Sequence, residues 1–205
     1  WLRRIAFQFR LYDTLRIDHF RGFDAYYAIP AKDTTARNGQ WRQGPGIDFF
    51  HAVQQTLGQK DIIAEDLGYL TDSVRQLLRE TGYPGMKVLE FAFADRENGS
   101  DYLPHCYTPH CVVYTGTHDN ETLAGWYAGL SIEAKTQVRN YLSDYYTPDD
   151  RMYKVLINLA MTAVAKDCIV PIQDHLGLGN EARMNQPGTV GFNWRWRLLP
   201  GQLTD

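Results

Sequence analysis

The stretch Asp61-Ile62-Ile63-Ala64-Glu65-Asp66 decides how this chain is interpreted. Its apolar, β-branched centre is typical of a short β-strand. Two carboxylates, Glu65 and Asp66, follow that centre directly. In α/β proteins, ligands and catalytic groups gather at the carboxyl ends of the strands. The stretch therefore predicts a strand that delivers acidic side chains to a functional edge.

Two other predicted strands also end in an acid. Asp18 lies near the end of the expected strand 15–20, and Asp119 comes shortly after the expected strand 111–115. The carboxyl ends of parallel strands point the same way, so we expect Asp18, Glu65 and Asp119 to converge on one cavity. Taken singly, each acid could equally be a helix cap or a surface charge.

Strand and helix signals alternate along the whole chain. We expect five strands, at 15–20, 61–65, 86–93, 111–115 and 168–172, and a long loop between residues 20 and 48. We expect helices at 1–11, 48–57, 71–81, 121–130, 132–145 and 150–165. This alternation predicts an α/β fold with a parallel sheet covered by helices. Because a complete (β/α)₈ barrel takes about 250 residues, five units leave either an open sheet or part of a barrel.

Composition limits the classes of function. The chain has 205 residues, 44% of them hydrophobic, and a formal net charge of −3. This charge gives no reason to expect nucleic acid or an anionic membrane as a partner. No apolar run is long enough for a membrane span, and the three cysteines favour a reducing compartment. No linker divides the sequence, so we expect one domain over residues 1–205. The chain begins with Trp1, which suggests a piece of a longer protein.

Paired carboxylates across a sugar linkage are what glycoside chemistry requires. One ionised carboxylate attacks the anomeric carbon, and one carboxyl group protonates the leaving oxygen. A third acid can stabilise the positive charge of the transition state or hold sugar hydroxyls. The three strand-end acids therefore predict an enzyme acting on glycosidic bonds.

The motifs around these acids resemble the amylomaltase family of 4-α-glucanotransferases, from about residue 15 to residue 198. The strand-end motifs that carry the resemblance are Arg16-Ile17-Asp18-His19-Phe20-Arg21-Gly22-Phe23, Ile63-Ala64-Glu65-Asp66-Leu67-Gly68 and Gly116-Thr117-His118-Asp119-Asn120-Glu121-Thr122. Later matches are Gln173-Asp174, Leu176-Gly177, Met184-Asn185, Pro187-Gly188 and Asn193-Trp194-Arg195-Trp196-Arg197. The resemblance implies the C-terminal part of a (β/α)₈ TIM barrel, strands 4 to 8, with the earlier strands absent from this chain.

The resemblance also implies roles for single residues. Asp18 would be the nucleophile, Glu65 the general acid/base and Asp119 the stabiliser of the transition state. Arg16 would orient Asp18, and His118 would donate a hydrogen bond to the sugar. The other residues expected to bind substrate are Asp66, Asn120 and Asn185.

The implied reaction transfers a segment of an α-1,4-glucan donor to the 4-hydroxyl of glucose or a maltooligosaccharide, with retention and without metal or organic cofactor. The implied location is the cytoplasm, or the plastid stroma in a plant or alga. Two alternatives stay open: a retaining hydrolase of the α-amylase type, and a catalytically inactive glucan-binding fragment. Unpaired sheet edges would leave a truncated chain inactive by itself and prone to self-association.

Other patterns admit competing interpretations. Residues 177–182, Gly-Leu-Gly-Asn-Glu-Ala, fit a dinucleotide fingerprint only if they open a helix, and Pro187 and Gly188 argue against one. His105-Cys106 and His110-Cys111 could suggest zinc, although a structural loop fits better. His19 is either a core histidine or a sugar contact. Tyr26, Tyr27 and Trp41 either stack on sugar or pack. Trp194 and Trp196 alternate with arginines in a strand-like way, which favours a scaffold role over stacking on glucan.

Overall fold

The computed structural model describes residues 1–93 and 101–203. These residues form two compact units, Trp1–Met86 and Lys87–Asp205, and each unit is described by itself. The expectation of one domain stays a prediction. Parallel strands with flanking helices occur in both units, so the predicted α/β class is confirmed.

The first unit is built around two parallel strands. β1 (Thr14–Ile17) pairs with β4 (Asp61–Ala64), and the register places Ile17 opposite Ala64. The two strands therefore end side by side, and Asp18 and Glu65 are the first residues after them. The expected strand 15–20 was too long, because His19 adopts a left-handed conformation (φ 48°) and a 3₁₀ turn follows at Phe20–Phe23.

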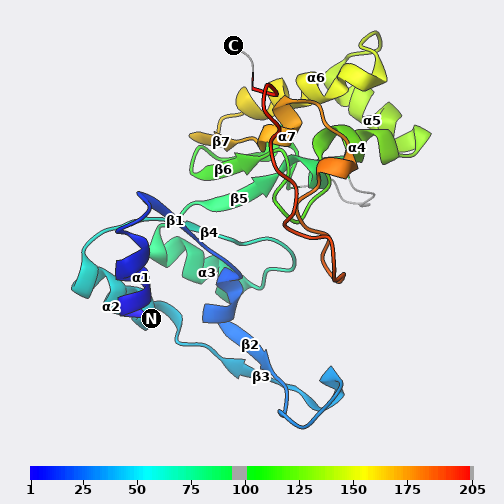
Figure 1. The fold of residues 1–205 in the computed structure, drawn as a ribbon. Coiled ribbons are helices and arrows are strands. Elements are labelled where there is room, and N and C mark those ends of the chain that lie inside the picture. Colours follow the sequence, from blue (N-terminus) through cyan, green and yellow to red (C-terminus); the bar gives the residue numbers. More distant parts are fainter. Residues whose placement is uncertain (94–100, 204–205) are drawn as a thin grey trace. The chain divides into compact units, whose positions relative to one another are not determined.

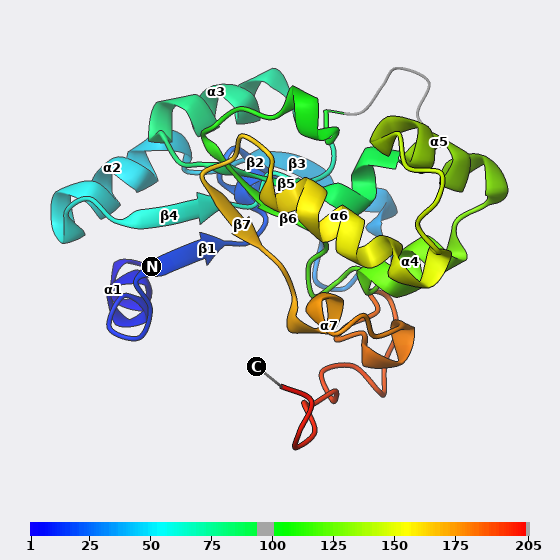
Figure 2. The same cartoon turned by 90° about the horizontal axis from the view of Figure 1, so that it is seen from above.

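Helices cover these strands through an aromatic and aliphatic core. α2 (Gly46–Leu57) and α3 (Asp72–Thr81) are the helices of this unit that follow its long loop (Figures 1 and 2). They contribute Phe50, Val74 and Leu77, which pack with Phe20 and Ala64. The Thr71 hydroxyl accepts a hydrogen bond from the Val74 N–H and so caps α3, as the sequence predicted. The N-terminal helix is shorter than expected, since α1 spans Leu2–Gln8.

The segment predicted as a long loop contains an antiparallel hairpin. β2 (Ala25–Ala28) pairs with β3 (Gln40–Gln43), and the hairpin extends from the unit in Figure 1. Gly39 and Gly44, which indicated a loop, flank β3. Tyr27 and Trp41 are Cα partners in the register, and their rings meet edge to face at 5.5 Å. The segment predicted as a loop therefore contains a short pair of strands, and aromatic residues form contacts between them.

The second unit holds a three-stranded sheet in the order β5-β6-β7. β5 (Gly85–Val88) enters it from the end of the first unit, and β6 (Cys111–Tyr114) pairs in parallel with β7 (Asp167–Ile169). The predicted strand 86–93 was half right, because its second half forms a 3₁₀ helix at Leu89–Phe93. An apolar run without alternation cannot separate these two states by itself. The last predicted strand was also too long, because Pro171 ends it and a short helix begins.

Helices pack on this sheet through a second core. They are α4 (Leu123–Gly129), α5 (Ile132–Leu142), α6 (Met152–Met161) and the short α7 (Ile172–His175). Val113 of β6, Leu123 of α4, Val138 of α5 and Leu156 of α6 are completely buried in that core (Figure 2). Thr122 and Ser131 cap α4 and α5. Among the described residues, no helix has the length and apolar character needed to span a membrane.

Candidate active site

In the first unit, the residues after β1 and β4 are tied together at the strand ends. The Glu65 N–H donates to the Ile17 carbonyl at 2.9 Å, and the Phe20 N–H donates to the Glu65 carbonyl at 3.0 Å. One Glu65 carboxylate oxygen accepts from the His19 N–H at 2.6 Å, and the other accepts from the Leu67 N–H at 2.9 Å. The carboxylate of Glu65 is therefore held by the residue that follows Asp18.

Asp18 has one charged neighbour on its own strand. The Arg16 guanidinium lies 3.1 Å from the Asp18 carboxylate, and the Asp18 side chain is 79% exposed. Residues two apart on a strand share a face, which is why Arg16 reaches Asp18. The Arg16 Nε atom also lies 3.2 Å from the Met86 sulfur. Arg16 thus fixes the direction of a carboxylate that is otherwise open to a ligand.

Asp66 takes part in packing as well as standing at a strand end. Its carboxylate accepts from the Met86 N–H at 2.7 Å and lies directly against Gly85, where any side chain would clash with it. Asp66 therefore joins the end of β4 to the beginning of β5. Its contact with substrate stays a prediction.

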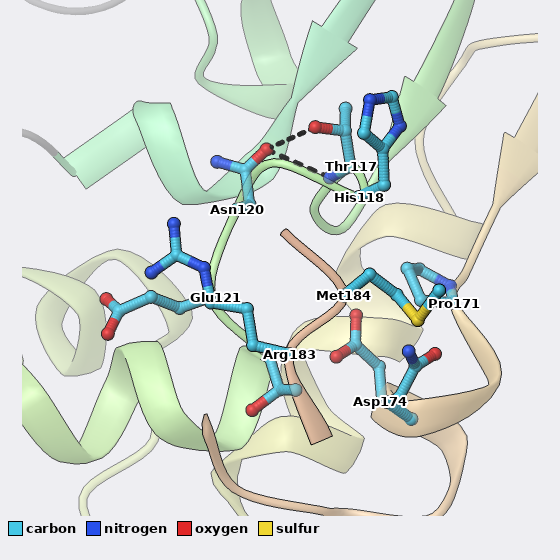
Figure 3. A pocket seen from close by; sticks show the side chains of 10 residues that line it. Thr117, His118, Asn120, Glu121, Pro171, Asp174, Arg183 and Met184 are labelled. Atoms are coloured by element: carbon cyan, nitrogen blue, oxygen red, sulfur yellow. Dashed lines mark hydrogen bonds between the residues drawn. The ribbon is translucent and has the colours of Figure 1, made fainter. Parts of the chain in front are cut away.

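In the second unit, a tight turn after β6 carries His118 and Asp119. The Asn120 side-chain oxygen accepts from the Thr117 N–H at 2.9 Å and from the Thr117 hydroxyl at 2.7 Å (Figure 3). The Asn120 N–H donates to the Thr117 carbonyl at 3.1 Å. Asn120, predicted to bind substrate, thus closes the turn that holds the neighbouring acid, and its contact with sugar stays a prediction.

Three side chains surround Asp119. The Asn185 amide donates to the Asp119 carboxylate at 2.6 Å, and His118 Nε2 lies 3.5 Å from the same oxygen. Arg183 donates to the Asp119 carbonyl at 2.7 Å and to the Asn185 carbonyl at 2.9 Å. The structure thus brings together three of the predicted residues, His118, Asp119 and Asn185. Arg183 was missed, although it stands next to the matched Met184-Asn185 motif.

Beside this turn is a pocket of about 180 Å³. Ten residues line it: Thr117, His118, Asn120, Glu121, Thr122, Pro171, Gln173, Asp174, Arg183 and Met184 (Figure 3). They come from the loop after β6, from α7 and from the segment before Asn185. The pocket therefore lies where the matched motifs of the second unit meet.

Two buried carboxyl groups lie under the turn, and neither was chosen from the sequence. Asp174 accepts from the Leu123 N–H at 2.7 Å and from the Thr115 hydroxyl at 2.6 Å. Burial raises the pKa of Asp174, and these two hydrogen bonds act against the increase. Burial raises the pKa of Glu90 well above the usual carboxyl range, and the nearby charges of Asp174 and Glu121 add to the effect. Glu90 lies inside the predicted strand 86–93, so the rule that found Glu65 could not select it; in the structure the strand ends at Val88, shortly before Glu90.

The remaining sequence patterns have these outcomes. Residues 180–182 form only a 3₁₀ turn, so the helix required for a dinucleotide fingerprint does not follow residues 177–179. Among residues 1–93 and 101–203, no group of three or more His, Cys, Asp or Glu side chains has the arrangement of a metal site. The strand-like alternation at Trp194 does not form a strand, because that residue has a left-handed backbone (φ 65°). Its ring lies 5.1 Å from the His118 ring.

Comparison with known proteins gives one consistent family. A family model described as 4-alpha-glucanotransferase matches residues 1–203. A 4-alpha-glucanotransferase of Thermus thermophilus is 46% identical over 210 residues, covering 100% of this chain and 42% of the relative. A chloroplastic/amyloplastic 4-alpha-glucanotransferase of Solanum tuberosum is 46% identical over 199 residues, covering 97% of this chain and 34% of the relative.

Solved structures agree with these sequences. An amylomaltase of Streptococcus agalactiae in complex with acarbose superposes with a TM-score of 0.93 at 39% identity, over 100% of this chain and 41% of that one. The chain thus spans about two fifths of the length of such relatives. Since the family model matches almost every residue, this chain belongs to the 4-alpha-glucanotransferase family.

Proposed function

We propose that this chain supplies the catalytic acids of a 4-α-glucanotransferase that works by retaining double displacement. The observation that carries the proposal is the pairing of β1 with β4, which places Asp18 and Glu65 directly after neighbouring parallel strand ends. The hydrogen bond from the His19 N–H to Glu65 ties the two loops together. Family membership and the glucan-type chemistry of paired carboxylates support the same assignment.

In the first step, Asp18 attacks the anomeric carbon of an α-1,4-glucan donor while Glu65 protonates the leaving 4-oxygen. Arg16 orients the attacking carboxylate. The N–H groups of His19 and Leu67 stabilise the carboxylate that remains on Glu65 after it gives up its proton. The product of this step is a β-linked glycosyl ester on Asp18 and a free glucan.

In the second step, Glu65 removes the proton from the 4-hydroxyl of glucose or a maltooligosaccharide. That oxygen attacks the anomeric carbon and displaces Asp18, so one α-1,4 bond forms for each one broken. Asp119, held by Asn185 and Arg183, would stabilise the oxocarbenium-like charge in both steps. Two inversions give retention, which requires the Asp18 and Glu65 carboxyl groups to lie about 5–5.5 Å apart. No metal or organic cofactor takes part in this proposal.

The proposal includes an architecture and a location. Strands β1, β4, β5, β6 and β7 would be strands 4 to 8 of a (β/α)₈ barrel, an architecture in which catalytic residues follow the carboxyl ends of the strands. We place the protein in the cytoplasm, or in the plastid stroma of a plant or alga. Without the other strands, the chain would expose sheet edges, remain inactive and tend to self-associate.

The test uses the protein encoded by the complete reading frame, called the full-length protein below, incubated with maltotriose. Transfer predicts glucose together with chains longer than maltotriose. Shortened products alone would indicate a hydrolase, and no turnover would indicate a glucan-binding protein. Asp18→Asn and Glu65→Gln should abolish the longer products. Asp13→Asn, at an exposed position just before the same strand, should leave them unchanged.

A further inference from the structure

Glu90 is a buried carboxyl group that the proposed reaction does not use. It stands just after β5, at the start of the 3₁₀ helix, and only 5% of the residue is exposed. Its backbone N–H donates to the Thr115 carbonyl at 3.3 Å, which places it beside the residues that lead into the Asp119 turn. Burial of an unpaired charge is costly, so we expect a buried acid at this position to have a structural or functional role.

The Glu90 side chain contacts the turn through Asn120. The Asn120 side chain lies close to the Glu90 carboxyl, since a β-carbon built on Gly116 would meet both residues. The Asn120 amide lowers the pKa of Glu90, so it presents its donor side to the carboxyl. The side-chain oxygen of Asn120 is already occupied by the N–H and hydroxyl of Thr117. Glu90 therefore selects one orientation of the Asn120 amide. With the amide reversed, two donors would face each other at Thr117.

The Glu90 carboxyl group also fills the space beneath Gly116. A β-carbon added to Gly116 would lie 2.7 Å from the Glu90 Oε1 atom, closer than real contacts allow. That oxygen is buried and has no hydrogen-bond partner among the described residues. The carboxyl thus packs against both ends of the turn, at Gly116 and beside Asn120.

The charges around Glu90 favour its neutral form. Asp174 on α7 and Glu121 on the loop before α4 repel a negative charge there, and the positive charge of Arg183 opposes them. Arg183 already donates to the carbonyl groups of Asp119 and Asn185. An ionised Glu90 would compete for Arg183 and so disturb the support of Asp119. A neutral carboxyl leaves this arrangement intact.

We propose that Glu90 is a positioning residue that fixes the Thr117–Asn120 turn and thereby the placement of His118 and Asp119. The inference rests on the proposed glucan transfer for its catalytic consequence. Its structural consequence, the order of the turn, is independent of that function. Glu90 does not touch the reacting atoms and acts through Asn120 and Gly116.

The test compares Glu90→Gln with Glu90→Ala in the full-length protein. Glutamine keeps the shape and the acceptor for Asn120 without a charge, so its kcat for maltotriose transfer should stay within about threefold of the original. Alanine leaves the Asn120 amide unsupported, and kcat should fall by about 100-fold with a smaller change in KM, as expected for a misplaced catalytic group. Glu133→Gln and Glu133→Ala, at an exposed position on α5, are the matched controls and should change neither parameter.

Hydrogen exchange of the peptide containing Thr117–Asn120 separates this inference from the proposed function. The peptide should exchange faster in Glu90→Ala and at the original rate in Glu90→Gln, even if the protein transfers no glucan. Original kcat and exchange in Glu90→Ala would overturn the proposal. So would equal losses in both variants, since they would show that the charge is needed. If the alanine variant fails to fold, unimpaired Glu90→Gln supports the neutral form and impaired Glu90→Gln contradicts it.

Discussion

Replacement of Asp174 tests how the second unit holds its functional loop. Its carboxylate accepts from the N–H of Leu123, the first residue of α4, and from the Thr115 hydroxyl at the end of β6. Asp174, Leu123 and Thr115 are each at most 1% exposed. Asp174→Ala therefore leaves two buried donors without their acceptor.

The magnitude follows from these contacts. A buried donor that loses its partner costs about 1–3 kcal/mol, so two such donors cost roughly 2–6 kcal/mol. Removal of a buried carboxylate relieves part of this loss, because burial disfavours the charged form. We expect a net loss of about 2–4 kcal/mol in the free energy of unfolding. For proteins of about 150–250 residues, that corresponds to a decrease of roughly 5–15 °C in Tm.

The assay is thermal unfolding followed by circular dichroism, with hydrogen exchange at the Leu123 amide as a local measurement. Asp174→Asn keeps an acceptor for the Leu123 N–H, and the Thr115 hydroxyl can turn to accept from the new amide. We therefore expect it to lose about 1 kcal/mol or less. Asp167→Ala, at an exposed position on β7, should change stability by about 0.5 kcal/mol at most. If Asp174→Ala has the same Tm as the Asp167→Ala control and the Leu123 amide exchanges no faster than in the original protein, the reasoning is refuted.

Three further predictions concern single substitutions. The pKa of Glu90 is raised on folding, so the stability that this carboxyl contributes is complete below its ordinary pKa of 4.5 and is lost as the pH rises toward its pKa in the folded protein. The Tm of Glu90→Gln should therefore rise relative to that of the original protein as the pH increases above 4.5, and a pH-independent difference would contradict this. Gly116→Ala should lower kcat by about tenfold or more because its methyl group displaces the Glu90 carboxyl, whereas Gly129→Ala, with open space around it, should leave kcat unchanged. Equal kcat values in the two variants would show that the contact between Gly116 and Glu90 does not matter for transfer. Arg16→Ala should lower kcat by about 10–100-fold with a smaller change in KM, because Asp18 loses its orienting partner, and Arg16→Lys should restore part of kcat. An unchanged kcat of Arg16→Ala in steady-state transfer assays would show that the ion pair does not orient Asp18.

The local signals of the sequence predicted the elements well where side chains and turn residues agreed. The β-branched run at Ile62 and Ile63 forms β4, and Thr71 caps α3 as expected. Asp18 and Glu65 lie just after strands because burial stabilises the apolar residues before them, whereas burial of a carboxylate is unfavourable. Such signals are local, and a single sequence is enough to show them.

The missed features depend on contacts between distant residues. The hairpin of β2 and β3 is stabilised by cross-strand pairs such as Tyr27 with Trp41, which no local pattern announces. Arg183 reaches Asp119 from 64 positions away in the sequence, and Glu90 is buried by a turn that comes after it. The long predicted strand at 86–93 was shortened because its apolar side chains are buried equally well in a 3₁₀ helix.

The assignment of the nucleophile is the central claim, and covalent trapping tests it most directly. A fluorinated α-glucosyl fluoride that glycosylates the nucleophile of a retaining enzyme quickly and is released slowly is incubated with the full-length protein, and the digested peptides are analysed by mass spectrometry. The account predicts one hexosyl adduct, on Asp18, that is lost in Asp18→Asn. A stable adduct on any other carboxylate, with Asp18 unmodified while the enzyme turns over, would contradict it.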